Sequence, residues 1–399
     1  MALTDTIETL RRLVAFDTVS SHSNIALIDW VADRLESQGI QVFVQHGAEP
    51  GKANLLATAG PTDRPGLMLS GHSDVVPVTG QQWHSDPFVL TERNGRLYGR
   101  GSADMKGFIA CCLDALPRLA AMPLRTPVHL ALSYNEETDM GGMRLLAKHL
   151  AASAAPPAAC IIGEPTMMQV VVANKGAAIY RCRIRGFSVH SSLRDRGVSA
   201  VEIGAEVVAF LNAQQRLLSA GLRHDGFEFP HTSVHVGMIQ GGTAHNITAR
   251  DCELVFEVRA LPGISASTVV DALRAHCAAV LLPQMRAISP ECDIHIDEVV
   301  DAPALDERGN THLAQAIMPL CDCVRPHRVS FGTEAGILQE AGVPTVVCGP
   351  GDIQVAHQPD EHVEIVQLDR CLGFLDRLAD RLVQGTLPLG AAQQSARPV

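Results

Sequence analysis

The sequence has 399 residues, 46% of them hydrophobic, so it is long enough for two or three domains with sizeable cores. Its formal net charge of −11 argues against a nucleic-acid partner and mildly favours a cationic small substrate. The first residues lack the basic and apolar segments of a signal peptide, and no apolar run approaches the length of a membrane span. We therefore expect a cytoplasmic protein that acts on a small molecule and binds neither nucleic acid nor a membrane.

The eleven cysteines form no CxxC pair, the spacing most typical of thiolate metal sites. Two of them are the neighbours Cys111 and Cys112, and most of the others lie within apolar or mixed runs. We interpret all of them as reduced structural thiols, as in a cytoplasmic protein.

In chain order, the first part of the sequence alternates between amphipathic helical patterns and apolar strand patterns. The periodicity predicts elements at residues 4–15 (helix), 26–38 (helix), 40–45 (strand), 53–58 (strand), 66–70 (strand), 107–116 (helix), 127–134 (strand), 142–149 (helix) and 158–162 (strand). Pro117 is expected to end the third helix. Strands that alternate with helices and carry polar residues at their ends predict an α/β sheet.

The pattern then changes to one that is typical of a small α+β domain. Strand, helix, strand, strand, helix and strand are predicted at 175–187, 199–218, 232–239, 251–260, 265–281 and 292–300. This is the ferredoxin-like (βαββαβ) order, in which both helices cover one face of a four-stranded sheet. The first pattern resumes with a helix at 310–320, a strand at 345–348 and a helix at 366–383.

We therefore expect two domains. The first is α/β, with a central mixed sheet flanked by helices, and is discontinuous, formed by residues 1–174 and 301–399. The second, at residues 175–300, is inserted into the first.

The strand pattern at 66–70 leads directly into His72 and Asp74. In open α/β sheets, ligands bind at the carboxyl ends of the strands. Residues two apart on an extended segment share a face, and a carboxylate beside a histidine ring is a common pairing at metal sites. A lone histidine beside a strand is more often structural, so the interpretation depends on what else lies nearby.

Further strand ends or glycine-rich turns in the α/β domain also carry potential metal ligands. Together with His72 they are Asp104, Glu136, Glu137, Glu164 and His357. Histidine and carboxylate ligands suit zinc first, with cobalt or manganese also plausible. So many acids in one dry site would repel one another without cations. Two metal ions bridged by one carboxylate remove the repulsion, and they supply hydrolytic chemistry.

Six motifs in this order carry a specific resemblance: SGHSDVVPV, YGRGSADMKG, NEE, GEPT, GFSVHSS and GPGDIQVAHQPDE. The sequence resembles, over nearly its whole length, the di-zinc family of aminoacylases, acetylornithine deacetylases and succinyl-diaminopimelate desuccinylases. GEPT, GMIQGGTAHN and FGTEAG are most similar to the acetylornithine deacetylase pattern. The resemblance implies a cytoplasmic homodimer that hydrolyses N2-acetyl-L-ornithine to L-ornithine and acetate, a step of arginine biosynthesis.

The resemblance also implies a role for each ligand candidate. One metal ion would be held by His72 and Glu164, the other by Glu137 and His357, and Asp104 would bridge them. Asp74 would orient His72 by accepting its second ring N–H. Glu136 matches the general base that takes a proton from the bridging water and returns it to the leaving amine. A cis peptide bond between Asp104 and Met105 is expected on the same ground.

Residues of the inserted domain match the family's lid and dimerisation domain. His190 matches a histidine that stabilises the oxyanion from the partner subunit, and Asn246 matches a second lid residue in the closed site. Arg259 matches an arginine that binds the substrate carboxylate, although an alternating strand also carries arginines simply as surface residues.

We interpret Glu334 as the partner of the ornithine ammonium group, although an acid at this position also suits the start of a helix. It lies in a glycine-rich turn with Gly332, where backbone N–H groups also have access to the substrate.

Two alternatives stay open. The same scaffold serves other N-acyl amino acids, succinyl-diaminopimelate and dipeptides, so the fold does not settle the substrate. A non-catalytic relative that only binds a ligand would lack a metal ligand or the base, and the sequence lacks neither.

Overall fold

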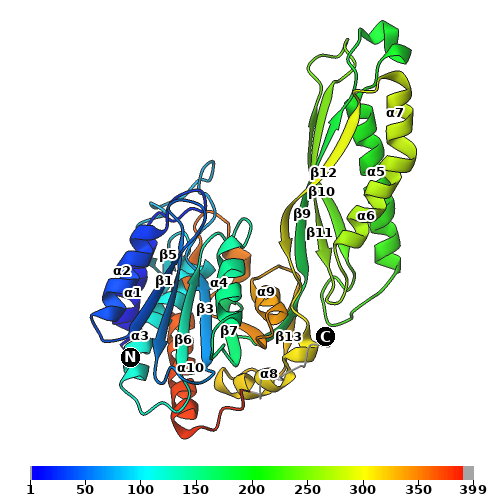
Figure 1. Ribbon diagram of the computed structural model, residues 1–399. Coiled ribbons are helices and arrows are strands. Elements are labelled where there is room, and N and C mark those ends of the chain that lie inside the picture. Colours follow the sequence, from blue (N-terminus) through cyan, green and yellow to red (C-terminus); the bar gives the residue numbers. More distant parts are fainter. Residues whose placement is uncertain (1, 390–399) are drawn as a thin grey trace. The chain divides into compact units, whose positions relative to one another are not determined.

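The computed structural model describes residues 2–389, which form two compact units (Figure 1). The first unit comprises the described residues up to Ala173, the segment Leu305–Arg328 and the described residues from Thr333 onwards. The second unit comprises Asn174–Ala304 and Val329–Gly332. None of the helices within residues 2–389 is long and apolar enough to cross a membrane.

The first unit is built around an eight-stranded sheet with the order β1-β2-β6-β3-β7-β14-β8-β13. Its strands are β1 (Gln41–His46), β2 (Ala53–Ala59), β3 (Leu67–His72), β6 (Val128–Ser133), β7 (Ala159–Pro165), β8 (Val171–Asn174), β13 (His327–Val329) and β14 (Thr345–Gly349). The central strands β6, β3, β7 and β14 pair in parallel, whereas β1 with β2 and β2 with β6 are antiparallel. This mixed sheet flanked by helices confirms the predicted fold class.

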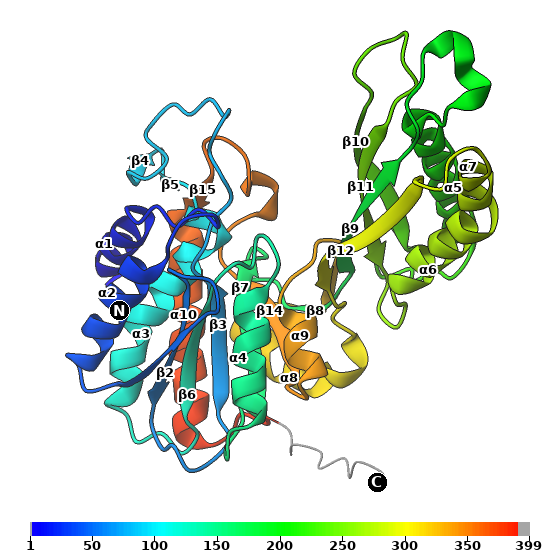
Figure 2. The ribbon, with the colours of Figure 1, turned by 45° about the horizontal axis from the view of Figure 1, so that its top comes forward.

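Helices cover both faces of this sheet. They are α1 (Leu3–Val14), α2 (Ile25–Glu36), α3 (Gly107–Ala120), α4 (Gly141–Ala151), α8 (Thr311–Ile317), α9 (Ala335–Glu340) and α10 (Ile365–Gln384). Figure 2 shows α1, α2, α3 and α10 on one side of the sheet and α4 and α9 on the other. The side chains of β3 also indicate that both faces of the sheet are covered. Leu67 and Leu69 join the large core with α3 and α10, whereas Met68, which points to the other face, is buried outside that cluster.

The sequence predicted that helix α3 ends at Pro117. In the structure the helix continues past this proline to Ala120. Leu116 and Leu119 are both buried in the core, so packing of the last turn outweighs the single backbone hydrogen bond that proline removes.

The second unit is a four-stranded antiparallel sheet with the order β10-β11-β9-β12. Its strands are β9 (Gly176–Arg185), β10 (Ser233–Gly241), β11 (Asp251–Ala260) and β12 (Asp293–Ala302), and its helices are α5 (Ala200–Ala220), α6 (Ser267–His276) and α7 (Leu282–Ile288). The helices lie on one face, where Tyr180 and Phe256 stack at 5.5 Å in the core. The predicted helix over 265–281 is interrupted by a π-helical segment, Cys277–Leu281. The βαββαβ arrangement itself is as predicted.

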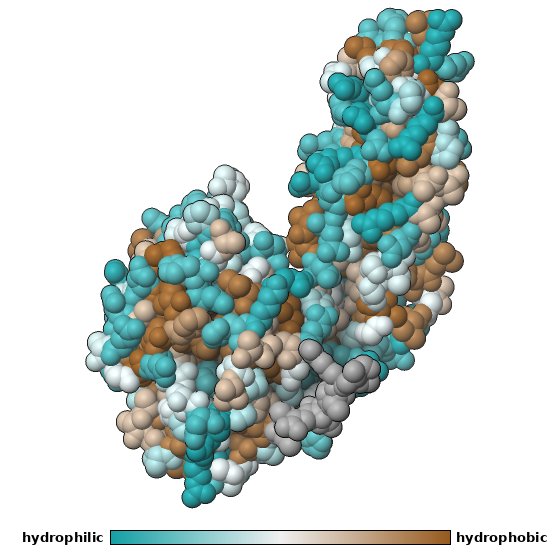
Figure 3. Space-filling view, viewed as in Figure 1, coloured by the Kyte–Doolittle hydropathy of each residue, from teal (hydrophilic) through white to brown (hydrophobic). Residues whose placement is uncertain are grey.

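Several short elements were not predicted. Strands β4 (Thr91–Arg93), β5 (Arg96–Tyr98) and β15 (His362–Glu364) form a separate small sheet in the first unit. Three-residue strands carry too few positions for a periodic pattern to emerge. In Figure 3, hydrophilic residues are spread over the visible surface of each unit.

Two glycines allow close packing at the carboxyl ends of strands β7 and β14, Gly349 between the two strands and Gly163 against helix α3. A Cβ on Gly349 would lie 2.0 Å from the carbonyl oxygen of Gly163, and a Cβ on Gly163 would lie 2.0 Å from the ring of Phe108. No side chain fits at either position. The close approach places Glu164, the next residue of β7, in the interior at the end of the parallel strands.

Candidate metal centre

The ligands predicted from the sequence converge at the carboxyl ends of the parallel strands of the first unit. His72 is the last residue of β3, Glu164 lies near the end of β7, and Glu136 and Glu137 follow β6. The remaining pair lies outside the sheet. Asp104 lies in a short π-helical turn, Ser102–Lys106, just before α3, where its peptide bond to Met105 is cis, as predicted, and His357 lies in the loop after β14.

Asp104 lies between the two histidines. The Oδ1 atom of Asp104 is 3.0 Å from His72 Nε2, and its Oδ2 atom is 3.2 Å from His357 Nε2. Glu164 Oε1 is 3.7 Å from His72 Nε2, and Glu137 Oε1 is 3.0 Å from His357 Nε2. His72, Asp104 and Glu164 therefore form one group with ligand atoms within 4.8 Å of one another, and Asp104, Glu137 and His357 form a second.

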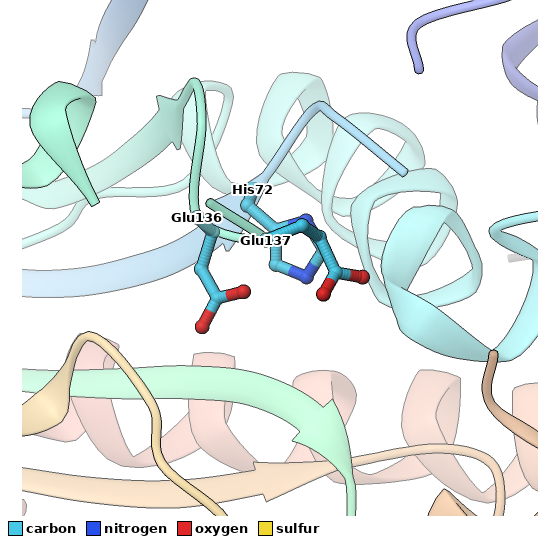
Figure 4. Close-up of side chains that lie close together, drawn as sticks. All are labelled: His72, Glu136 and Glu137. Carbon is cyan, nitrogen blue, oxygen red and sulfur yellow. The ribbon is translucent and has the colours of Figure 1, made fainter. Parts of the chain in front are cut away.

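Glu136 and Glu137 are adjacent in the sequence, but their side chains point in different directions (Figure 4). A third close group consists of His72, Glu136 and Glu137, and Figure 4 shows the two carboxylates directed to different sides of the histidine ring. One glutamate can therefore bind an ion beside His357 while the other stays available for proton transfer.

Burial and mutual charge dominate the electrostatics of the glutamates. Burial, together with the neighbouring carboxylates, raises the pKa of Glu136, Glu137 and Glu164 above the usual value for glutamate. Burial also disfavours the charged form of Asp104, but hydrogen bonds to His357 and His72 outweigh it and lower the pKa of Asp104.

The pKa values of the two histidines are also raised, which favours the charged form of a histidine, whereas a raised pKa favours the neutral form of a glutamate. Hydrogen bonds to Asp104 and Glu137 raise the pKa of His357 to about 10. Burial opposes the charged form of His72, but the hydrogen bond to Asp104 and the charge of Glu164 raise its pKa well above 6.5. Protons on these rings therefore occupy the place that cations would take among the acids.

The residues present fit two divalent ions. The donors are imidazole nitrogens and carboxylate oxygens, the set preferred by borderline ions such as zinc. Glu164 Oε1 is buried and has no hydrogen-bond partner among the described residues, which is costly unless an ion completes its coordination. Asp104 has one oxygen directed towards each group, as a bridging carboxylate requires.

Asp74 contacts His72 through its backbone carbonyl and three other residues through its carboxylate. The nearest acceptor of His72 Nδ1 is the backbone carbonyl of Asp74, at 2.9 Å, whereas the Asp74 carboxylate lies 3.7 Å away. The predicted orientation of His72 therefore runs mainly through the main chain. The carboxylate instead accepts the backbone N–H groups of Glu136 at 3.1 Å and Glu137 at 3.3 Å, and the Ser20 hydroxyl at 2.6 Å. The sequence shows no local signal for these long-range contacts.

Glu334 lies in the first unit and is 1% exposed. Its Oε2 atom accepts a hydrogen bond from the Ser133 hydroxyl at 2.9 Å, and Ser133 pairs with His72 between strands β6 and β3. Its Oε1 atom is buried without a hydrogen-bond partner among the described residues, and burial raises the pKa of Glu334 to about 7.

The remaining predicted site residues belong to the second unit, where they form two local groups. His190 and Asn246 lie on adjoining loops, because the N–H of Ser191 donates to the Asn246 carbonyl at 3.0 Å. Arg259 forms an ion pair with Glu257 at 2.9 Å, and its Nη1 atom lies 3.8 Å from the position that a Cβ on Gly332 would take.

Comparison with known proteins identifies similar sequences over most of the chain. A model of peptidase family M20/M25/M40 matches residues 68–381. An acetylornithine deacetylase of Proteus mirabilis (strain HI4320) is 36% identical, over 94% of this chain and 96% of the relative. An acetylornithine deacetylase of Myxococcus xanthus is 37% identical, over 92% of this chain and 95% of the relative.

Solved structures share the fold at low identity. An M20 family metallo-carboxypeptidase of Sulfolobus solfataricus matches with a TM-score of 0.76 at 16% identity, over 95% of this chain and 99% of that chain. A dinuclear metal-binding peptidase of the M20 family from Bacillus subtilis matches with a TM-score of 0.66 at 14% identity, over 96% of this chain and 98% of that chain.

Metal binding at this centre is expected to release protons. Ligands must be deprotonated to bind an ion, and a pKa of about 10 keeps the His357 ring protonated at neutral pH in the metal-free chain, while the pKa of His72 is raised in the same direction. The affinity for Zn²⁺ should therefore rise with pH, by about one order of magnitude per pH unit for each proton released. Titration calorimetry in buffers of different ionisation enthalpy measures the released protons.

The matched control for this titration is His357→Ala, which should release fewer protons than the unmodified chain. Heats that do not depend on the buffer, together with an affinity that is constant between about pH 6 and pH 8, would contradict the expectation.

Proposed function

Because the chain belongs to peptidase family M20/M25/M40 and is a metal-dependent hydrolase of amide bonds, we propose that it hydrolyses N2-acetyl-L-ornithine to L-ornithine and acetate. The observation that carries the reaction type is the position of Asp104 between His72 and His357, with both of its oxygens engaged. The similarity to two acetylornithine deacetylases along more than nine-tenths of the chain supports the substrate. On this proposal the protein acts in arginine biosynthesis in the cytoplasm.

Two divalent ions, zinc first and cobalt as the alternative, would be held by the two groups that share Asp104. His72 and Glu164 belong to one group, and Glu137 and His357 to the other. Ions bound there supply Lewis acidity, which polarises the amide carbonyl and makes a water molecule more acidic.

Glu136 is the proposed general base. It is buried close to His72 but need not be a ligand, because Glu137 already lies 3.0 Å from His357. Hydrogen bonds from the backbone of both glutamates to Asp74 fix the loop that carries them. The Glu136 carboxylate takes a proton from the attacking water and delivers it to the amine nitrogen as the amide bond breaks.

The second unit is proposed to act as a lid and as the dimer interface. Its edge strand β10 exposes Met238 by 52% and Ile239 by 49%, large apolar side chains that pairing with a second subunit would cover. His190 of the partner subunit would stabilise the oxyanion, with Asn246 beside it. Arg259 would bind the substrate carboxylate, with Gly332 offering a backbone N–H.

The role of Glu136 predicts a loss of turnover without loss of metal. In Glu136→Gln the side chain keeps its shape but no longer accepts the proton, so kcat should fall by about two to four orders of magnitude. Metal content, measured by mass spectrometry, should stay at two ions per chain. Glu137→Gln is the matched control and should lose metal. If Glu136→Gln loses metal and Glu137→Gln does not, the two roles are exchanged.

The substrate proposal predicts a selective effect at Glu334. Its unpartnered Oε1 atom supports a role in binding the ornithine ammonium group, which acetylmethionine lacks. In Glu334→Gln, kcat/KM for acetylornithine should fall roughly ten- to a hundred-fold more than kcat/KM for acetylmethionine. Ser133→Ala removes only the hydroxyl that donates to Glu334 and should affect both substrates alike. Equal losses in Glu334→Gln would show a structural role and leave the ornithine assignment without support from this residue.

Catalysis across subunits predicts complementation. Glu136→Gln and His190→Ala subunits should each be inactive alone, because one lacks the base and the other the oxyanion contact. Mixed and allowed to exchange, they should regain activity, since one of the two sites in a heterodimer then carries both intact residues. Exchange is followed with two differently labelled subunits in sedimentation. No recovery despite confirmed exchange would place His190 in the site of its own subunit.

A further inference from the structure

Arg100 and Glu361 form a fully buried ion pair beside the metal centre. Arg100 Nη1 donates to Glu361 Oε2 at 2.6 Å, and each side chain is 1% exposed. Neither residue belongs to the groups of candidate ligands. Burying two charges removes both from water, and the mutual attraction often does no more than offset that cost. The pair is therefore not expected to add much to the stability of the fold by itself. Its other contacts indicate a role in holding the backbone near the metal centre.

Glu361 holds the main chain of Asp104. Its Oε1 atom accepts the backbone N–H groups of Ala103 and of Asp104, both at 3.0 Å. The same carboxylate thus binds Arg100 through one oxygen and the turn before α3 through the other. The side chain of Asp104 is left free to lie between His72 and His357.

Arg100 extends this network to His357 through Gln81. Arg100 Nη2 donates to Gln81 Oε1 at 2.6 Å, and Gln81 Nε2 donates to the backbone carbonyl of His357 at 2.8 Å. Trp83 Nε1 also donates to Gln81 Oε1, at 3.0 Å, which fixes the amide. His357 has a φ of 63°, in the left-handed region that a histidine rarely adopts unless its surroundings hold it there.

The network reaches the ligands that the sheet does not position. His72 and Glu164 are residues of strands β3 and β7, and the sheet hydrogen bonds hold them in place. Asp104 and His357 lie in a turn and a loop. Hydrogen bonds to groups just outside a metal site tune its affinity, and losing one typically costs about ten- to a hundred-fold.

We propose that Arg100, Glu361 and Gln81 are positioning residues that set the spacing of Asp104 and His357, and so affect binding of one of the two metal ions more strongly than binding of the other. The ion affected more strongly is the one assigned to Asp104, Glu137 and His357, because the other group shares only Asp104 with the network. The inference rests on the proposed two-metal function. It adds that the two sites depend on the buried side-chain network to different degrees, because the sheet positions His72 and Glu164.

The test measures Zn²⁺ binding to the full chain by titration calorimetry and metal analysis. Gln81→Met, which keeps the length of the side chain but removes its hydrogen bonds, should weaken one of the two dissociation constants about ten- to a hundred-fold. The other should stay within about threefold. Glu361→Gln should weaken both sites, since they share Asp104, but should weaken the site with His357 more strongly. Gln81→Met keeps the test decisive if Glu361→Gln does not fold.

Asp114→Asn is the matched control for Glu361→Gln. Asp114 is also a buried carboxylate paired with an arginine, Arg34, and its other partners are the hydroxyls of Thr6 and Thr9 on α1. This variant should bind both ions as the unmodified chain does, although it too removes the charge of a buried carboxylate that is paired with an arginine.

Three results would count against the inference. Unchanged binding of both ions by Gln81→Met and folded Glu361→Gln would overturn it, and so would an equal loss at both sites, which indicates a general structural role. Fewer than two ions on the unmodified chain would overturn the proposed function first, and the inference with it.

Discussion

Repulsion among buried carboxylates is the constraint around which the first unit is arranged. Asp104, Glu136, Glu137 and Glu164 converge on two histidines at the ends of the parallel strands. Such a cluster is unfavourable unless positive charge lies among the acids. In the chain itself, protons on the histidines supply part of that charge. Two divalent ions would supply more positive charge than these protons, and the same ions would also supply the Lewis acidity for hydrolysis.

The backbone around the cluster is held by carboxylates that are not ligands. Asp74 accepts two successive backbone N–H groups of the loop that carries Glu136 and Glu137. Glu361 does the same for Ala103 and Asp104. Both arrangements fix a loop through its main chain, so the side chains remain directed at the centre. Strands β3 and β7 hold the other two candidate ligands, His72 and Glu164. The close contact at Gly349 between β7 and β14 places Glu164 beside the remaining ligands.

Local sequence patterns were sufficient to select the residues that converge. An apolar strand that runs into a histidine or an acid is a local signal, and the alternation of strands and helices implies a common edge. Local sequence patterns did not predict contacts between residues that lie far apart in the sequence. Nothing near Asp74 indicates that its carboxylate binds the backbone after β6, and Arg100 shows no sign of its pairing with Glu361. Metal binding by the converging residues stays a prediction, as do the roles of His190, Asn246 and Arg259 in the second unit.

The most direct test of the two-metal centre is anomalous X-ray scattering from crystals of the protein grown with Zn²⁺. We expect two peaks about 3.5–4 Å apart with Asp104 between them, one beside His72 and Glu164 and the other beside Glu137 and His357. A single peak, or two peaks that do not share Asp104, would contradict this expectation.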